Sequence, residues 1–262
     1  MCGPGGIHPR IVPNQPDGTI AINDLEAAVR PENIHFPRTR LIVLENTHNR
    51  CAGSPLTPEY MDRVGDIAQQ YALKVHVDGA RIFNAAVALG VDVRTLAGRA
   101  DSVTFCLSKG LAAPVGSLVC GSEAFIFEAR RARKVLGGGM RQAGVLAAAG
   151  IVAIEEMMER LREDHANARA LAEGLAEIEG LFVIPTQCRT NIVYADISPD
   201  VAASADAFAQ ALMQKGVGVL PTGANQIRLV THYPITEADV VHALDVMRAI
   251  SEQEGAGADG PA

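Results

Sequence analysis

The sequence predicts an α/β fold, with a mostly parallel sheet in a large domain and a smaller C-terminal α+β domain. Three observations support this prediction. An apolar run at residues 41–45 is followed by a helical pattern from Thr57 to Tyr71 and a second β-like run at 74–78, so strands and helices alternate. A third β-like run follows at 102–107. At 262 residues and 48% hydrophobic, the chain is also long enough for more than one lobe.

The elements of the large domain follow from local signals. Residues 22–29 form a short helix that ends before Pro31, and residues 41–45 read as a strand covered on both faces. Thr57 can cap a helix with Pro58 in its first turn. Ser122 caps a helix through residue 135, and a long helical stretch at about 140–178, including a packed Ala/Gly-rich part, leads into the second lobe.

The second lobe is predicted from shorter runs. Thr236 and Asp239 have the spacing of a capping box at the start of the last helix. Strands are expected at residues 182–184, 191–197, 217–220 and 227–231, and helices at 205–214 and 236–250. We divide the chain into the remainder of a large domain (1–153), a small domain (154–251) and a Gly/Ala/Glu-rich disordered tail (252–262).

Composition narrows the functional classes. The formal net charge of −7 and scattered acidic groups predict no nucleic-acid partner. Five cysteines without paired spacing indicate reduced thiols, so we expect a cytoplasmic protein without a metal site. No apolar run is long enough to span a bilayer and no signal peptide is seen, so no membrane partner is expected.

Two strand ends carry the chemistry. The run at 74–78 ends at Asp78, and the run at 102–107 delivers Ser108 and Lys109 to the same edge of a parallel sheet, where such folds bind ligands. Asp78 is expected to be buried there. A buried carboxylate can keep a pyridine nitrogen protonated, and a desolvated lysine amine can bind a carbonyl cofactor covalently. Alone, each motif is a common turn or loop; together they predict a pyridoxal 5'-phosphate site.

The chain resembles the low-specificity L-threonine aldolases, which are fold type I pyridoxal-phosphate enzymes of the aspartate aminotransferase superfamily. The resemblance runs from about Gly5 to Ile250. The matching segments are residues 33–36 (NIHF), 44–49 (LENTHN), 76–84 (HVDGARIFN), 105–110 (FCLSKG), 137–142 (GGGMRQ) and 228–232 (RLVTH). This set, in this order, is highly specific.

The resemblance implies roles for four further residues. It places Arg81, at the start of a helix, beside the phenolic oxygen of the cofactor, and Arg141 near the cofactor phosphate of a neighbouring subunit. It therefore implies a homo-oligomer, a dimer or tetramer, with sites at subunit interfaces. His35 corresponds to a histidine near the substrate hydroxyl, where a neutral imidazole could take a proton. His48 and neighbouring residues are expected to shape a loop.

Arg228 is the candidate for binding the substrate carboxylate. It lies between Ile227 and Leu229 in an apolar strand, where an unpaired guanidinium is costly and a partner is needed. Arginine grips a carboxylate through two parallel hydrogen bonds. For each of these residues a structural role stays open: a salt bridge for Arg228 or Arg141, a solvated side chain for Arg81, and a plain loop hydroxyl for Ser108.

One departure from the family concerns the amino terminus. Family members carry a preceding segment with a Gly-Thr phosphate-binding turn, a side chain that stacks on the cofactor ring and an oligomer-contact arm. None of these three features has a counterpart in this sequence, in which Met1 to Pro4 run directly into the matching part. We therefore expect weak cofactor binding. The predicted reaction is cleavage of a β-hydroxy-α-amino acid such as threonine to glycine and an aldehyde. Other pyridoxal-phosphate chemistry, such as β-elimination, and a catalytically incompetent fragment remain alternatives.

Overall fold

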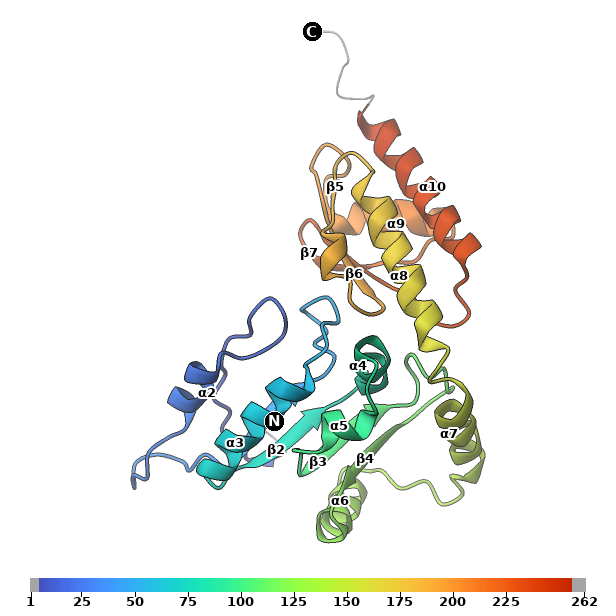
Figure 1. Cartoon of the computed structure of the whole chain (residues 1–262). Coiled ribbons are helices and arrows are strands. Elements are labelled where there is room, and N and C mark those ends of the chain that lie inside the picture. The colour runs from blue at the N-terminus through green and yellow to red at the C-terminus, as the bar shows by residue number, and fades with distance from the viewer. Residues whose placement is uncertain (1–4, 256–262) are drawn as a thin grey trace.

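The first of two sheets confirms the predicted, mostly parallel arrangement. The computed structural model describes residues 5–255. The first sheet contains β1 (Leu41–Glu45), β2 (Lys74–Asp78), β3 (Ser102–Cys106) and β4 (Ser117–Gly121), in that order. The first three strands are parallel, and β4 runs antiparallel to β3. The carboxyl ends of three consecutive strands therefore meet at one edge (Figure 1).

The first lobe contains several helices, two of which begin at a cap that the sequence predicts. They are α2 (Ile22–Ala28), α3 (Pro58–Gln70), α4 (Ile82–Leu89), α5 (Val93–Ala97), α6 (Glu123–Val135) and α7 (Gly144–Glu156). The Thr57 side chain accepts a hydrogen bond from the backbone N–H of Tyr60 at 3.3 Å, and Pro58 lies in the first turn. Ser122 caps α6 in the same way, through the N–H of Phe125. Both predicted caps are confirmed.

A second, antiparallel sheet is formed by the C-terminal part of the chain. Its elements are α8 (Leu161–Ala176), β5 (Leu181–Phe182), a 3-10 turn (Pro185–Gln187), β6 (Ile192–Ile197), α9 (Ala205–Gln214), β7 (Leu220–Gly223), β8 (Gln226–Val230) and α10 (Glu237–Gly255). The strand order is β5-β6-β8-β7. The capping box of α10 is confirmed, because the Thr236 N–H donates to Asp239 Oδ2 at 2.8 Å and the Asp239 N–H donates to Thr236 Oγ1 at 3.3 Å.

Two separate hydrophobic clusters fill the two lobes. The first extends from Leu25 to Leu161, and the second from Ala168 to Met247, so the packing changes partner within α8. The division of domains at residue 153 stays a prediction. Within residues 5–255, no helix combines the length and apolar character needed to cross a membrane.

Three predictions about the first lobe are wrong. The long helix at 140–178 is divided into α7 and α8 by a break at residues 157–160. The Ala/Gly-rich part is not a packed helix either, because α7 buries only Gly150 and Ala153 while Val145 is 75% exposed. Strand β1 buries alternate residues, Ile42 and Leu44, because side chains alternate between the two faces of a strand and only one face of β1 is covered within residues 5–255.

The second lobe departs from prediction at its shortest elements. Strand β5 covers only the first residue of the predicted run at 182–184, and β7 begins at the last residue of the run at 217–220. Helix α10 continues through residues 252–255, which were expected to be disordered. Residues 256–262 of that predicted tail lie outside the described part of the chain.

Candidate active site

A tight turn after β2 brings the candidate residues to the carboxyl edge of the first sheet. Asp78 ends the strand and is the register partner of Glu45 on one side and Thr104 on the other. The Gly79 N–H donates to the Thr104 carbonyl oxygen at 2.8 Å, and a Cβ on Gly79 would lie 2.8 Å from the same oxygen. Only glycine fits this close approach, which sends the chain directly into α4 with Arg81 as its N-cap residue.

The Asp78 carboxylate is exposed, and the prediction that it is buried is wrong. Its Oδ1 atom accepts a hydrogen bond from the Ala80 N–H at 3.2 Å. Asp78 is the last residue of β2, beyond the buried pair Val75 and Val77, so its side chain lies at the open edge of the sheet. The carboxylate is therefore available to a ligand at that edge.

Lys109 follows β3 in a loop whose backbone is well held. The Leu107 N–H donates to Gly116 O at 2.9 Å, and the Ala112 N–H donates to Lys109 O at 2.8 Å. Lys109 itself is exposed, and its amine has no hydrogen bond or ion pair within residues 5–255. Ser108 is also exposed, with its N–H 3.4 Å from Gly116 O. An ordered loop thus presents an exposed amine after β3, the parallel neighbour of β2.

Arg81 and Arg228 converge from the two lobes on one side chain. Asn49 Oδ1 lies 3.3 Å from Arg81 Nη1 and 3.0 Å from Arg228 Nη1. Arg228 Nε is buried without a hydrogen-bond partner among the described residues. Burial and the charge of Arg228 lower the pKa of Arg81 below its usual value.

The salt bridge considered as an alternative role for Arg228 is not found in residues 5–255, where neither Arg81 nor Arg228 has a carboxylate within ion-pair distance. A buried guanidinium nitrogen without an acceptor is costly, and an anionic ligand would supply the missing acceptor. The pair is therefore suited to bind a carboxylate or a similar anion.

The loop after β1 supports this arrangement. The Asn49 N–H donates to Glu45 Oε1 at 3.0 Å, and the Tyr194 hydroxyl donates to the Asn49 carbonyl oxygen at 3.2 Å. His48 Nε2 lies 3.7 Å from Glu45 Oε2. Sequence reasoning gave this loop only a shaping role and missed the contacts of Asn49. The polar LENTHN run directly after a strand was the available signal, because ligands bind at strand carboxyl ends.

Two predicted site residues are not brought to this edge by any described contact. His35 is exposed in the loop that enters the amino end of β1, and the hydrogen bond of its backbone N–H is local, to Asn33 Oδ1 at 2.8 Å. Arg141 is exposed in the loop between α6 and α7 (Figure 1). Their predicted roles stay predictions.

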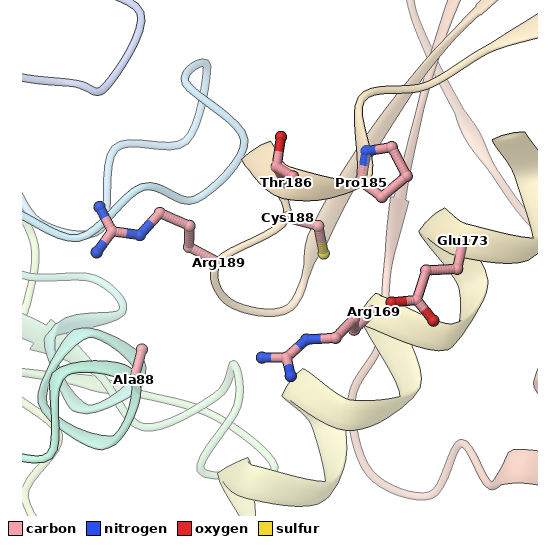
Figure 2. Close-up of a pocket in the computed structure, with 7 residues that line it drawn as sticks. All are labelled: Ala88, Arg169, Glu173, Pro185, Thr186, Cys188 and Arg189. Atoms are coloured by element: carbon pink, nitrogen blue, oxygen red, sulfur yellow. The ribbon is translucent and has the colours of Figure 1, made fainter.

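A cavity of about 410 Å³ lies elsewhere, where α4 and α8 approach the 3-10 turn (Figure 2). Burial raises the pKa of its Cys188 thiol to about 11. The lining residues are Ala88, Arg169, Glu173, Pro185, Thr186, Cys188 and Arg189. None of the predicted site residues is among them, so this cavity is separate from the strand-end site.

The residues at the strand ends fit the predicted cofactor. Pyridoxal phosphate has a basic ring nitrogen, an acidic ring oxygen and an aldehyde, which suit a carboxylate, a guanidinium and a free lysine amine, respectively. Asp78, Arg81 and Lys109 supply these three groups from two neighbouring strand ends.

Comparisons with known proteins agree with this site. Residues 3–198 match the family model described as beta-eliminating lyase. "Probable low-specificity L-threonine aldolase 2" of Arabidopsis thaliana is 50% identical over 248 residues, which cover 94% of this chain and 70% of the relative. "Low specificity L-threonine aldolase" of Escherichia coli K12 is 40% identical over 245 residues, with coverages of 94% and 70%.

A solved structure shows the same fold. The threonine aldolase of Leishmania major superposes with a TM-score of 0.72 at 18% identity, over 90% of this chain and 69% of that one. The family model covers the whole strand-end site, and the curated relatives align with nearly the full chain. This chain therefore belongs to the beta-eliminating lyase family, in its low-specificity threonine aldolase branch.

Proposed function

We propose that this protein is a pyridoxal-phosphate-dependent aldolase that cleaves L-threonine, L-allo-threonine and related β-hydroxy-α-amino acids to glycine and an aldehyde. The observation that supports the proposal is the order of the strands: Asp78 ends β2 and Lys109 follows the neighbouring parallel strand β3, while Asn49 joins Arg81 to Arg228 of the other lobe. The names of the relatives give the same reaction class.

Each residue at the cofactor has a distinct role in this proposal. When bound, the cofactor supplies an acceptor for the electron pair released at the substrate α-carbon. The Lys109 amine holds the cofactor, and Asp78 keeps a proton on the ring nitrogen. Arg81 donates to the ring oxygen, and Ser108 with a neighbouring subunit's Arg141 binds the phosphate.

Two residues act on the substrate. Arg228 binds the α-carboxylate through the Nε and Nη2 side of its guanidinium group. Its Nη1 atom already donates to Asn49, whereas Nε has no partner in the described residues. His35 receives the proton of the β-hydroxyl group, as a neutral imidazole can.

The assembly belongs to the same proposal. We expect a cytoplasmic homo-oligomer, a dimer or a tetramer, with each site completed by a neighbouring subunit. Support comes from the exposed apolar surface of the first lobe, where β4 is exposed throughout and α6 buries no residue. Light scattering coupled to size-exclusion chromatography measures the oligomer size, and a monomer at micromolar concentration would contradict this part.

The decisive experiment combines cofactor binding with product analysis. The purified chain is titrated with pyridoxal phosphate while its visible absorbance is followed, and glycine release from L-threonine is measured. Lys109→Ala should lose both signals, whereas Lys215→Ala removes an exposed lysine at the end of α9 and should keep both. A wild-type chain that neither binds the cofactor nor releases glycine would refute the proposal.

A second candidate reaction is β-elimination, which the name of the matching family model favours. The same strand-end residues could support it, because the cofactor serves many reactions. Products separate the two: aldol cleavage gives glycine and an aldehyde, whereas β-elimination gives a keto acid and ammonia. The aldolase proposal requires glycine and aldehyde in equal amounts.

A further inference from the structure

Two cationic side chains share a single neutral acceptor at the centre of the site. Arg81 Nη1 and Arg228 Nη1 both donate to Asn49 Oδ1, at 3.3 and 3.0 Å. One arginine comes from the start of α4 and the other from β8, 147 residues apart in sequence. Asn49 is therefore the direct link between the two guanidinium groups.

The chemistry of this acceptor matters because like charges repel. Two guanidinium groups that meet at one oxygen destabilise each other, and a carboxylate between them would relieve the repulsion. An amide oxygen accepts both hydrogen bonds without neutralising either charge. Within residues 5–255 neither arginine has a carboxylate within ion-pair distance, so the positive charge stays available to a ligand.

Asn49 is itself held in place from both lobes. Its N–H donates to Glu45 Oε1 at 3.0 Å, and its carbonyl oxygen accepts from the Tyr194 hydroxyl at 3.2 Å. Tyr194 is the register partner of Arg228 across β6 and β8. The backbone at Asn49 is thus fixed from both lobes, and its side-chain oxygen is held by the two arginines.

We propose that Asn49 is a positioning residue that holds Arg81 and Arg228 side by side while leaving both charges free for the cofactor ring oxygen and the substrate carboxylate. This inference rests on the proposed function for the identity of those two anions. The pairing of two arginines on a neutral acceptor stands independently of it.

The test uses a substitution that preserves shape and changes charge. Asn49→Asp keeps an acceptor oxygen in the same place, so both arginines should stay ordered and the chain should be at least as stable to urea. The new carboxylate cancels one of the two positive charges, so affinity for an added anion should fall roughly tenfold or more. A purely structural role would instead leave anion affinity unchanged.

Anion binding is measured without cofactor, on the chain labelled with 15N-arginine. Acetate is titrated while the Nε–H resonances of Arg81 and Arg228 are followed by NMR, with Arg228→Lys used to assign the second. Asn49→Ala, which loses the acceptor but adds no charge, should weaken acetate binding less than Asn49→Asp does. Asn225→Asp adds the same charge at an exposed turn before β8 and should bind acetate like the wild type.

The outcomes separate this inference from the proposed function. Acetate affinity of Asn49→Asp within twofold of the wild type would overturn the role of Asn49, whether or not the protein is an aldolase. A weakened acetate affinity supports it even if no glycine is released. In the cofactor-loaded protein, Asn49→Asp should raise the KM for L-threonine by a larger factor than it lowers kcat.

Discussion

Replacing Arg228 by alanine tests the substrate site most directly. The structure shows which part of the guanidinium is free: Nη1 donates to Asn49, while Nε is buried with no partner within residues 5–255. The edge formed by Nε and Nη2 can therefore donate two parallel hydrogen bonds to a carboxylate. Arg228→Ala removes both of these bonds and the charge behind them.

The expected effect follows from two charge-assisted hydrogen bonds. Truncating one partner of a buried charge pair costs about 2–5 kcal/mol, and about 1.4 kcal/mol corresponds to a factor of ten. The KM for L-threonine should therefore rise by roughly 30-fold to several thousand-fold. Arg228→Lys keeps the charge but not the two-pronged geometry, so its KM should lie between those of the wild type and the alanine variant.

Steady-state kinetics of glycine release give KM and kcat for each variant, and the visible absorbance of the bound cofactor serves as the control. Because Arg228 contacts the substrate and not the cofactor in this proposal, the absorbance should be nearly unchanged. A KM for Arg228→Ala within threefold of the wild-type value would refute the carboxylate role.

Three further predictions concern single side chains. Lys109→Ala should abolish both cofactor absorbance and aldol cleavage, and a retained visible band would exclude Lys109 as the cofactor lysine. His35→Ala should slow cleavage by about 10²–10⁴-fold while the cofactor spectrum stays intact. Full activity of this variant would show that His35 does not take part in the reaction. His165 is buried beside Asn84, and burial lowers its pKa to about 4. Because the pKa of His165 is lower in the folded protein than its value of 6.5 in the unfolded chain, its contribution to stability is fully present at pH values above 6.5. This contribution, about 3 kcal/mol, is lost as the pH falls from 6.5 toward 4. In urea unfolding at pH 7 and 4.5, His165→Gln should lose less stability than the wild type, and equal losses would contradict the assignment.

Local signals predicted much of the fold, because several elements are set by their own sequence. Thr57, Ser122 and Thr236 each cap the helix that the sequence assigned to them. The break at residues 157–160 was not predictable in this way, since Met-Met-Glu-Arg contains only good helix formers. At this break, the packing of α8 against the hydrophobic cluster of the second lobe sets where the new helix points, because tertiary contacts often override helix propensity.

The candidate site was only partly visible in the sequence. Asp78 and Lys109 could be found because each follows a strand in a parallel sheet, and strand order brings their ends together. The contact of Arg228 with Asn49 joins residues 179 positions apart and depends on how the two lobes dock. No periodicity or motif in the sequence predicts a contact between two residues so far apart in the chain. Strand β4 was also missed, because its apolar run from Leu118 to Cys120 is only three residues long and lies between glycines, which is too short to predict a strand.

The shared acceptor has a consequence for the mechanics of the molecule. Asn49 receives hydrogen bonds from Arg81 beside the first sheet and from Arg228 and Tyr194 of the second. In the proposed arrangement Arg81 holds the cofactor beside the first sheet and Arg228 holds the substrate carboxylate on the second, so the complete site exists only while the two lobes are docked. By mass action, a ligand that binds only the docked arrangement stabilises it by about 2.7 kcal/mol when present at one hundred times its dissociation constant. A rising substrate concentration would therefore hold the two lobes together more firmly.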